Sequence, residues 1–186
     1  IQNAHFTSKA IVDGIWSIAR RLGFNGGRVS EFSMGSGNFF GLMPAELRGE
    51  SALTGVERDS ITARIAKQLY PKANILGPLS FEDARFADNT FNLNVGNPPF
   101  GNESPYDETA RHLKGFSIHN FFFAKAIDKL APGGLHIQVV SRYLMDAQDS
   151  TAREYMAHRT RLVGAIRLPW TAFYENARTE VVTDIV

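Results

Sequence analysis

The sequence contains no cysteine among its 186 residues. This absence excludes disulfide bonds and thiolate metal sites, and it is compatible with a reducing cytoplasm, where we expect the chain to act. No apolar run reaches membrane-spanning length, and the first residues lack the basic and apolar pattern of a secretory signal. The five histidines lack metal-ligand spacing such as His-Glu-x-x-His. We therefore expect neither a membrane partner nor a metal.

An excess of charge of one sign is also missing. The chain has 20 Lys and Arg against 19 Asp and Glu, for a net charge of +1, and the positive residues are dispersed. Phosphate contacts supply most nonspecific affinity for nucleic acid, so this chain should hold DNA weakly by itself. Its length and its 44% hydrophobic content suit a single compact domain over residues 1–186. Because it starts at Ile1 and stops inside an apolar strand pattern, we expect this domain to be a fragment of a longer polypeptide.

Strand patterns alternate with helical patterns along the chain. Helices are predicted at 11–22, 60–69, 117–130 and 150–158, and strands at 28–32, 52–57, 73–76, 91–95, 136–141, 162–167 and 180–186. This alternation predicts an α/β fold with a mostly parallel sheet and helices on both faces. The connection at 169–179 has no helical pattern, which lets the last strand enter antiparallel.

The tetrapeptide Asn97-Pro98-Pro99-Phe100 carries the strongest functional signal in the chain. Its two prolines have fixed φ angles and no N–H, so the neighbouring carbonyls are free to accept hydrogen bonds outward. The Asn97 side chain adds another acceptor, and Phe100 adds an aromatic face. This combination suits a planar amino group on a flat ring. The alternative is a simple proline turn with a buried phenylalanine.

A glycine-rich turn follows an earlier strand pattern at residues 28–32. Gly35 and Gly37 permit backbone conformations and a close ligand approach that a Cβ would block. The turn is not a dinucleotide fingerprint, because Phe40 stands where a third glycine is required, and it is not a phosphate loop, because no Gly-Lys-Ser/Thr follows. Glu57 ends the next strand pattern, where a carboxylate can accept from both hydroxyls of a ribose.

These segments, in this order, resemble the S-adenosylmethionine-dependent N6-adenine DNA methyltransferases. The motif order is that of the gamma class: the glycine-rich segment at 31–37 comes first, then Glu57, then Asn-Pro-Pro-Phe at 97–100. The resemblance implies a Rossmann-like class I methyltransferase fold, with a seven-stranded and mostly parallel sheet whose last strand is antiparallel. It also implies a target-recognition domain after the catalytic one, and none is recognisable within these residues.

The resemblance extends to both ends of the chain. Residues 5–8 resemble the amino-terminal cofactor motif of the family, and residues 176–184 resemble its last catalytic-domain motif. Residues 117–122 and 164–173 are similar to the methylase modules of large, helicase-associated polypeptides from conjugative elements and phages. Further domains of the same polypeptide, including a helicase, are therefore expected partners.

The family's cofactor is S-adenosylmethionine, and its binding residues match a defined set in this sequence: Thr7, Ser8, Glu31, Gly35, Gly37, Glu57, Phe81 and Glu82. Thr7 and Ser8 would offer hydroxyls, Glu31 would organise the ammonium side, and the ring of Phe81 would pack on the adenine. Core packing is the alternative for that ring. The sequence departs from the family at Ser80, where many relatives have Asp, and at Phe32, which replaces the usual proline. Either Glu82 contacts the adenine amino group instead, or that contact is weaker in this chain.

The catalytic residues implied by the resemblance are Asn97, Pro98, Pro99 and Phe100. The side-chain oxygen of Asn97 and the carbonyl of Pro98 would accept the two N–H groups of adenine N6 and stabilise the developing positive charge. The base would have to be flipped out of the duplex, with Phe100 stacked on one face and Phe173 covering the other. Core packing is again the alternative for Phe173.

Two other functions remain open from the sequence. The same acceptor cluster also suits a protein glutamine amide or an RNA base, since both present a planar nitrogen. A catalytically degenerate methylase fold that serves as a scaffold in a larger DNA-processing protein is the third hypothesis. The intact tetrapeptide at 97–100 disfavours degeneration, while Phe32 and Ser80 leave room for it.

Overall fold

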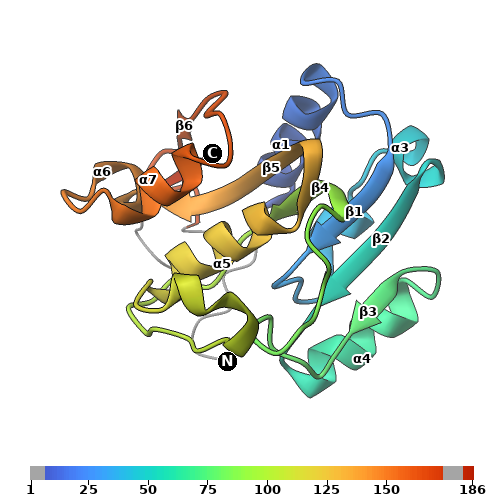
Figure 1. Ribbon diagram of the computed structural model, residues 1–186. Helices are drawn as coiled ribbons and strands as arrows, with labels where there is room; N and C mark the ends of the chain where they lie inside the picture. The colour runs from blue at the N-terminus through green and yellow to red at the C-terminus, as the bar shows by residue number, and fades with distance from the viewer. Residues whose placement is uncertain (1–6, 174–181) are drawn as a thin grey trace.

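The fold is built on one seven-stranded sheet. The computed structural model describes residues 7–173 and 182–186, and its strand order is β3-β2-β1-β4-β5-β7-β6 (Figure 1). The strands are β1 (Gly27–Glu31), β2 (Ser51–Val56), β3 (Asn74–Leu76), β4 (Phe91–Gly96), β5 (Leu130–Ser141), β6 (Ile166–Arg167) and β7 (Thr183–Ile185). The first five pair in parallel, and β7 runs antiparallel to both β5 and β6. The predicted mostly parallel sheet with an antiparallel last strand is confirmed.

Helices connect most of the strands. They are α1 (Lys9–Arg21), α2 (Asn38–Gly41), α3 (Ala45–Gly49), α4 (Ser60–Leu69), the 3-10 helix η1 (Glu108–Leu113), α5 (Ile118–Asp128), α6 (Tyr143–Asp146) and α7 (Thr151–Ala157). The sequence explains several helix ends. Gly23 takes a φ of 91° after α1, and Asp59 caps α4 by accepting the Thr62 N–H at 2.8 Å. In the part of the chain that the structure describes, no helix is long and apolar enough to cross a membrane.

Two apolar clusters cover the two faces of the sheet. One joins α1, α2 and α3 to inward side chains of the central strands, among them Val29, Leu93 and Val139. The other joins α5 and α7 to Val56 and Val140. Figure 1 shows α5 in front of the sheet and α1 behind it. The alternation of side chains along a strand puts neighbouring residues into opposite clusters, as expected for a sheet that is buried on both sides.

A short polar ladder crosses the centre of the sheet. Asn94 on β4 donates to both the carbonyl and the hydroxyl of Ser30 on β1, and Gln138 on β5 donates to Asn94 at 2.6 Å. All three side chains are buried. Because buried polar groups are costly without partners, these bonds favour a single register for the strands that carry the candidate site.

The larger differences from the predicted element boundaries lie at the end of α5, at the start of β5 and in the last two strands. Helix α5 ends at Asp128 rather than at residue 130, because Leu130 already pairs with Phe91 as the first residue of β5. The pairing register then shifts, so that Leu93 lies opposite Leu135, which places the Pro-Gly-Gly segment inside an irregularity of the strand. The predicted strand at 162–167 is reduced to β6. Of the predicted strand at 180–186, residues 183–185 form β7, and residues 180 and 181 lie outside the described residues.

Truncating the centre of the sheet should destabilise the fold. Leu93 is fully buried in β4, so Leu93→Ala should lower the free energy of unfolding by about 2–5 kcal/mol through lost burial and a residual cavity. Leu69→Ala is the matched control, because Leu69 is exposed at the end of α4, and this change should stay within about 0.5 kcal/mol. Urea unfolding of both variants measures the difference. Equal losses would contradict the assigned packing.

Candidate functional site

The predicted motifs meet at one edge of the sheet. Strands β1, β2 and β4 are parallel neighbours, so their carboxyl ends lie together. The glycine turn follows β1, Glu57 follows β2, and Asn97 follows β4. Two close approaches support this convergence. Glu57 binds the turn directly, and a Cβ on Gly96 would lie 3.7 Å from the Cγ of Glu31.

The carboxylate of Glu57 holds the glycine turn to the end of β2. One oxygen accepts the N–H of Gly35 at 2.7 Å, and the other accepts the N–H of Asp59 at 2.7 Å. A carboxylate has about four acceptor positions, so both oxygens keep capacity for a further donor. Gly35 has a φ of 54°, and a Cβ there would meet no atom within 4 Å. The turn is therefore fixed on its Glu57 side and open beside Gly35.

Gly37 is required for a different reason. It has a φ of 87°, and a Cβ there would lie 2.5 Å from the ring of Tyr70. The hydroxyl of Tyr70 donates to the Gly37 carbonyl at 2.7 Å. The second glycine thus lets the turn pack against the residue that ends α4, and the first leaves space in front of the turn.

Glu31 is a buried carboxylate at the end of β1. Its side chain is 2% exposed, and its Oε2 has no hydrogen-bond partner among the described residues. Burial raises its pKa well above the ordinary value of 4.5, and the neighbouring charge of Glu57 raises it further. A buried acceptor of this kind is matched to a cationic donor, which would supply both the missing bond and the opposite charge.

The Asn97–Phe100 segment leaves β4 beside these carboxylates. Pro98 is buried, whereas Asn97, Pro99 and Phe100 are partly exposed. The Phe100 ring lies 5.2 Å from the ring of His119 on α5, measured between centroids. His119 accepts the Ser141 N–H at 3.1 Å, and its burial lowers its pKa to about 4, so it is neutral at physiological pH. The family resemblance at residues 117–122 includes His119, but a lone histidine in a helix has no distinctive spacing that would predict its place behind Phe100.

A hollow of about 450 Å³ lies next to Glu57. The Leu79 N–H donates to the Glu57 carbonyl at 3.0 Å, which brings the segment after β3 against the end of β2. The walls come from residues on both segments and from one aromatic residue after the tetrapeptide: Arg58, Pro78, Leu79, Ser80, Glu82, Asp83 and Tyr106. Of the predicted cofactor residues, Glu82 lines this hollow. Arg58 and Tyr106 were not identified from the sequence.

Two of the predicted aromatic contacts lie in the core. The Phe81 ring is 1% exposed and stacks on Phe32, with the ring centroids 4.1 Å apart and the planes within 11°. Phe173 is fully buried and packs in the cluster that Phe100 also contacts. In this structure both rings therefore take the core-packing alternative. The stack also explains Phe32, which fills the apolar space next to Phe81 in place of the expected proline.

The amino-terminal and carboxyl-terminal motifs are only partly described. Thr7 is buried, and Ser8 precedes α1 as its N-cap residue. Among the described residues, neither hydroxyl makes a hydrogen bond to the glycine turn, so their role stays a prediction. Residues 5 and 6 of the first motif and residues 176–181 of the last lie outside the described residues.

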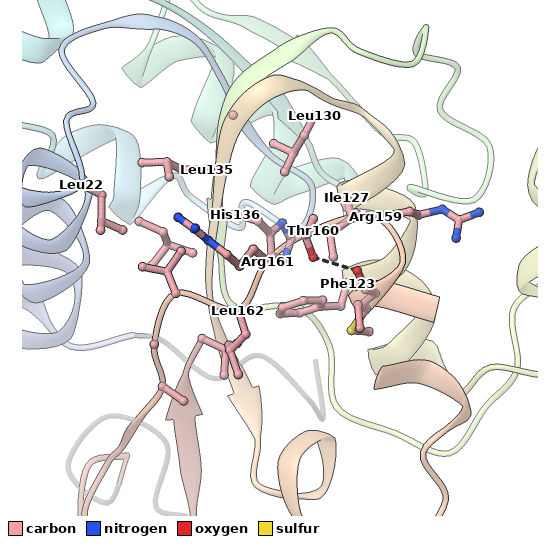
Figure 2. A pocket seen from close by; sticks show the side chains of 18 of the residues that line it. Leu22, Phe123, Ile127, Leu130, Leu135, His136, Arg159, Thr160, Arg161 and Leu162 are labelled. Carbon is pink, nitrogen blue, oxygen red and sulfur yellow. Dashed lines mark hydrogen bonds between the residues drawn. The ribbon is translucent and has the colours of Figure 1, made fainter. Parts of the chain in front are cut away.

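A larger hollow, of about 1260 Å³, lies away from these motifs. It opens at the start of β5 and is bounded by α5, the end of α1 and the segment around Leu162. Figure 2 shows Phe123 and Ile127 of α5 beside His136, with Leu22 and Leu162 further out. Burial lowers the pKa of His136 to about 3, so this histidine is neutral. Size alone therefore does not identify the site, because this hollow is at the opposite end of β5 from the converging motifs.

No group of three or more His, Asp or Glu residues that could hold a metal ion is found within residues 7–173 and 182–186. The charged groups that do converge, Glu31 and Glu57, are tied to the glycine turn and to the end of β1. The site is therefore built from carboxylates, backbone groups and the tetrapeptide.

Solved structures define the class of fold. The chain superposes on the methyltransferase subunit of a type I restriction-modification system from Streptococcus thermophilus with a TM-score of 0.80 at 16% identity, covering 100% of this chain and 44% of that one. It matches geranyl diphosphate methyltransferase, solved in complex with SAM, with a TM-score of 0.61 at 12% identity, covering 95% and 83%. The Rossmann-like methyltransferase fold is thereby confirmed.

The sequence comparisons define the family. The chain belongs to the Eco57I restriction-modification methylase family, whose model matches residues 51–169, more than half of the chain. It is also similar to Defense against restriction protein B of Escherichia phage P1, with 27% identity over 191 residues. That match covers 98% of this chain and 8% of the phage protein, so the chain spans less than a tenth of the length of that relative. The predicted resemblance to a DNA methylase family, and to methylase modules of large phage polypeptides, is confirmed at the level of the family.

Neutralising Glu31 should stabilise the ligand-free protein at neutral pH. A folded-state pKa above the unfolded value favours folding below about pH 4.5, and this contribution is lost as pH rises through the raised pKa. Glu31→Gln should remove this loss. The free energy of unfolding of the variant should exceed that of the wild type by an amount that grows with pH, up to about 1.4 kcal/mol for each unit by which the pKa of Glu31 is raised. Urea unfolding at several pH values measures it. Glu50→Gln, at an exposed position, is the control, and identical pH profiles for Glu31→Gln and wild type would contradict the assigned burial.

Proposed function

We propose that this domain transfers a methyl group from S-adenosylmethionine to the exocyclic N6 of adenine in DNA. The observation that carries the proposal is the convergence of the Asn97–Phe100 tetrapeptide with Glu31, Gly35 and Glu57 at the carboxyl edge of one methyltransferase sheet. Membership of a restriction-modification methylase family supports methyl transfer as the reaction class. The choice of adenine rests on the tetrapeptide.

The residues at this edge fit S-adenosylmethionine. The unpartnered buried oxygen of Glu31 matches the cofactor's ammonium group, and the open space beside Gly35 matches the methionine chain. The spare acceptor positions of Glu57 match the ribose hydroxyls. The adjoining hollow, with Arg58, Leu79 and Glu82 in its walls, would accommodate the adenine. Thr7 and Ser8 would add hydroxyls at the methionine end.

The bound cofactor supplies an electrophilic methyl group, and the tetrapeptide acts on the nucleophile. The exocyclic nitrogen of adenine is conjugated with the ring and therefore a weak nucleophile. Acceptance of its two N–H groups by the Asn97 side chain and the Pro98 carbonyl would favour a pyramidal nitrogen and stabilise the positive charge that develops on it. Direct in-line attack then needs only positioning, with no covalent enzyme intermediate.

The target base must leave the duplex to reach these acceptors. Phe100 is partly exposed at the end of the tetrapeptide, where its ring would stack on the flipped base. Phe173 belongs to the apolar cluster against which Phe100 packs, and it would support that ring or cover the second face of the base after a local movement. DNA is the proposed partner, and recognition or helicase domains within a longer polypeptide are proposed as additional partners, in keeping with the length of the phage relative.

A substrate panel tests the proposed function. The protein is incubated with methyl-labelled S-adenosylmethionine and separately with duplex DNA, the same duplex with every adenine replaced by 2-aminopurine, RNA, and a glutamine-containing protein. Label should enter the adenine-containing DNA alone, and digestion should recover it as N6-methyl-2′-deoxyadenosine. Label in RNA or in a glutamine side chain would assign the site to the other planar nitrogens. No transfer despite cofactor binding would favour the scaffold.

Removing the proposed ribose contact should weaken cofactor binding. Glu57→Ala deletes charge-assisted hydrogen bonds and also releases the Gly35 N–H, so affinity for S-adenosylhomocysteine should fall by about 1.5–3 kcal/mol. Titration calorimetry measures this loss. Glu108→Ala is the control, because Glu108 is exposed on η1. Unchanged affinity in Glu57→Ala would remove Glu57 from the cofactor site.

Asn97 should matter for the reaction far more than for binding. Asn97→Ala deletes an acceptor whose contribution grows as charge develops, so we expect the rate of methyl transfer to fall by about a hundredfold or more. Affinity for S-adenosylhomocysteine should change little. Single-turnover transfer to adenine-containing DNA, compared with calorimetry on the same variant, separates the two effects. A near-normal rate would exclude the proposed chemistry.

A further inference from the structure

The segment after the catalytic tetrapeptide is a closed loop. The Ser104 hydroxyl donates to the Phe116 carbonyl at 3.0 Å, which joins the two ends of the loop just before α5. Inside the loop, Asp107 caps η1 by accepting the Thr109 N–H at 2.8 Å. The loop therefore has a defined shape of its own, and it begins next to the proposed catalytic residues.

A buried ion pair fastens this loop to α5. The Nζ of Lys125 lies 2.7 Å from Oδ2 of Asp107, and the two side chains are 1% and 0% exposed. Arg85 also approaches Asp107, at 3.6 Å, from the exposed side. Burial works to raise the pKa of Asp107, but the bonds from Lys125 and Thr109 hold it below its ordinary value. Asp107 is therefore ionised at neutral pH and lies against the Lys125 ammonium group.

Lys125 also holds the segment that forms the wall of the 450 Å³ hollow. Its ammonium group donates to the Phe81 carbonyl and lies 3.3 Å from the Ala84 carbonyl. It also lies 4.3 Å from the centroid of the Phe81 ring, in a cation–π contact. One side chain therefore connects three parts of the molecule: the helix α5, the loop after the tetrapeptide, and the segment that places Glu82 in the hollow.

Tyr106 stands directly before Asp107 and lines the same hollow. Its side chain is 66% exposed, so apolar burial does not hold it there. The adjacent buried anchor does, because Asp107 cannot move away from Lys125 without leaving a charge unpaired in the interior. The other lining residues come from the segments that follow β2 and β3, including Arg58 and Ser80.

We propose that Tyr106 is an adenine-binding residue of the cofactor site and that the buried Asp107–Lys125 pair is the device that positions it. This inference rests on the proposed function, since it takes the hollow to be the adenine site. The Phe81 ring is stacked on Phe32 in the core and offers no face to the hollow. Tyr106, which lines the hollow, would provide the aromatic surface in its place. Cofactor binding and the order of the loop after the catalytic tetrapeptide are consequently linked.

The primary test replaces the exposed ring. Tyr106→Ala should weaken the binding of S-adenosylhomocysteine and of 5′-methylthioadenosine, which carries only the adenosine half, by about threefold to tenfold each. Tyr106→Phe should retain nearly all of the affinity, because the stacking face remains. Tyr143→Ala is the control, since Tyr143 is similarly exposed and lies outside the hollow. Because Tyr106 is exposed, folding should be unaffected.

A second test addresses the positioning pair. The double variant Asp107→Asn, Lys125→Met removes both charges together and so leaves neither buried alone. It should lower the affinity for 5′-methylthioadenosine to about the same extent as Tyr106→Ala. Amide hydrogen exchange across residues 103–116 should also become faster. Adding Tyr106→Ala to this double variant should then lower the affinity for 5′-methylthioadenosine by less than about twofold, since the ring has already lost its position.

The outcomes separate this proposal from the proposed function. If the wild-type chain binds neither ligand, the cofactor assignment and this proposal fall together. If the wild type binds and Tyr106→Ala binds equally well, this proposal alone is wrong. If Tyr106→Ala weakens binding by the same factor with and without the Asp107–Lys125 pair, Tyr106 is a binding residue but the pair does not position it.

Discussion

The hydrogen bond from the Gly35 N–H to the Glu57 carboxylate is the interaction on which the site depends. Parallel pairing brings the ends of β1 and β2 to the same edge, but a glycine turn is free to adopt many conformations. The Glu57 carboxylate selects one of them, because its two oxygens hold the N–H groups of Gly35 and Asp59. The residue expected to bind the ribose thus also shapes the turn expected to bind the methionine chain. The Glu57 side chain would therefore both bind the ribose and hold the glycine turn in its binding conformation.

The sequence predicted the fold well because the fold is set by patterns that a sequence displays. Alternating apolar strands and helical segments define a parallel sheet, and the missing helix before the last strand implies its reversal. The errors lie where tertiary contacts decide. Leu130 has a helical neighbourhood in the sequence, yet pairing with Phe91 makes it a strand residue. Ile166 and Arg167 form β6 because β7 lies beside them, while residues 162–165 have the same apolar character and no strand partner.

The candidate site was predictable in its backbone and less so in its aromatic residues. Glycines, a carboxylate at a strand end and a proline pair have local requirements that spacing reveals. Whether a phenylalanine faces a ligand or the core depends on neighbours far apart in the chain. Phe81 stacks on Phe32, the residue that follows β1, and no local pattern contains that pair. Tyr106 was passed over for the same reason, since its location follows from a contact between Asp107 and a lysine on α5.

The energetics of the edge disfavour a purely structural role for this domain. Glu31 places a carboxyl group in the interior without a described partner for one oxygen, and its raised pKa records a cost to the folded state near neutral pH. Gly35 adopts a left-handed conformation beside open space, where no neighbouring side chain requires a glycine. A scaffold gains nothing from either feature, because a neutral side chain at position 31 would make the same fold more stable. A binding site for a cationic ligand gains from both, since the ligand's ammonium group offsets the buried charge and its chain occupies the space that the glycine leaves. The buried Glu31 carboxyl group and the open space beside Gly35 are therefore the features that would contribute to the affinity for a cofactor.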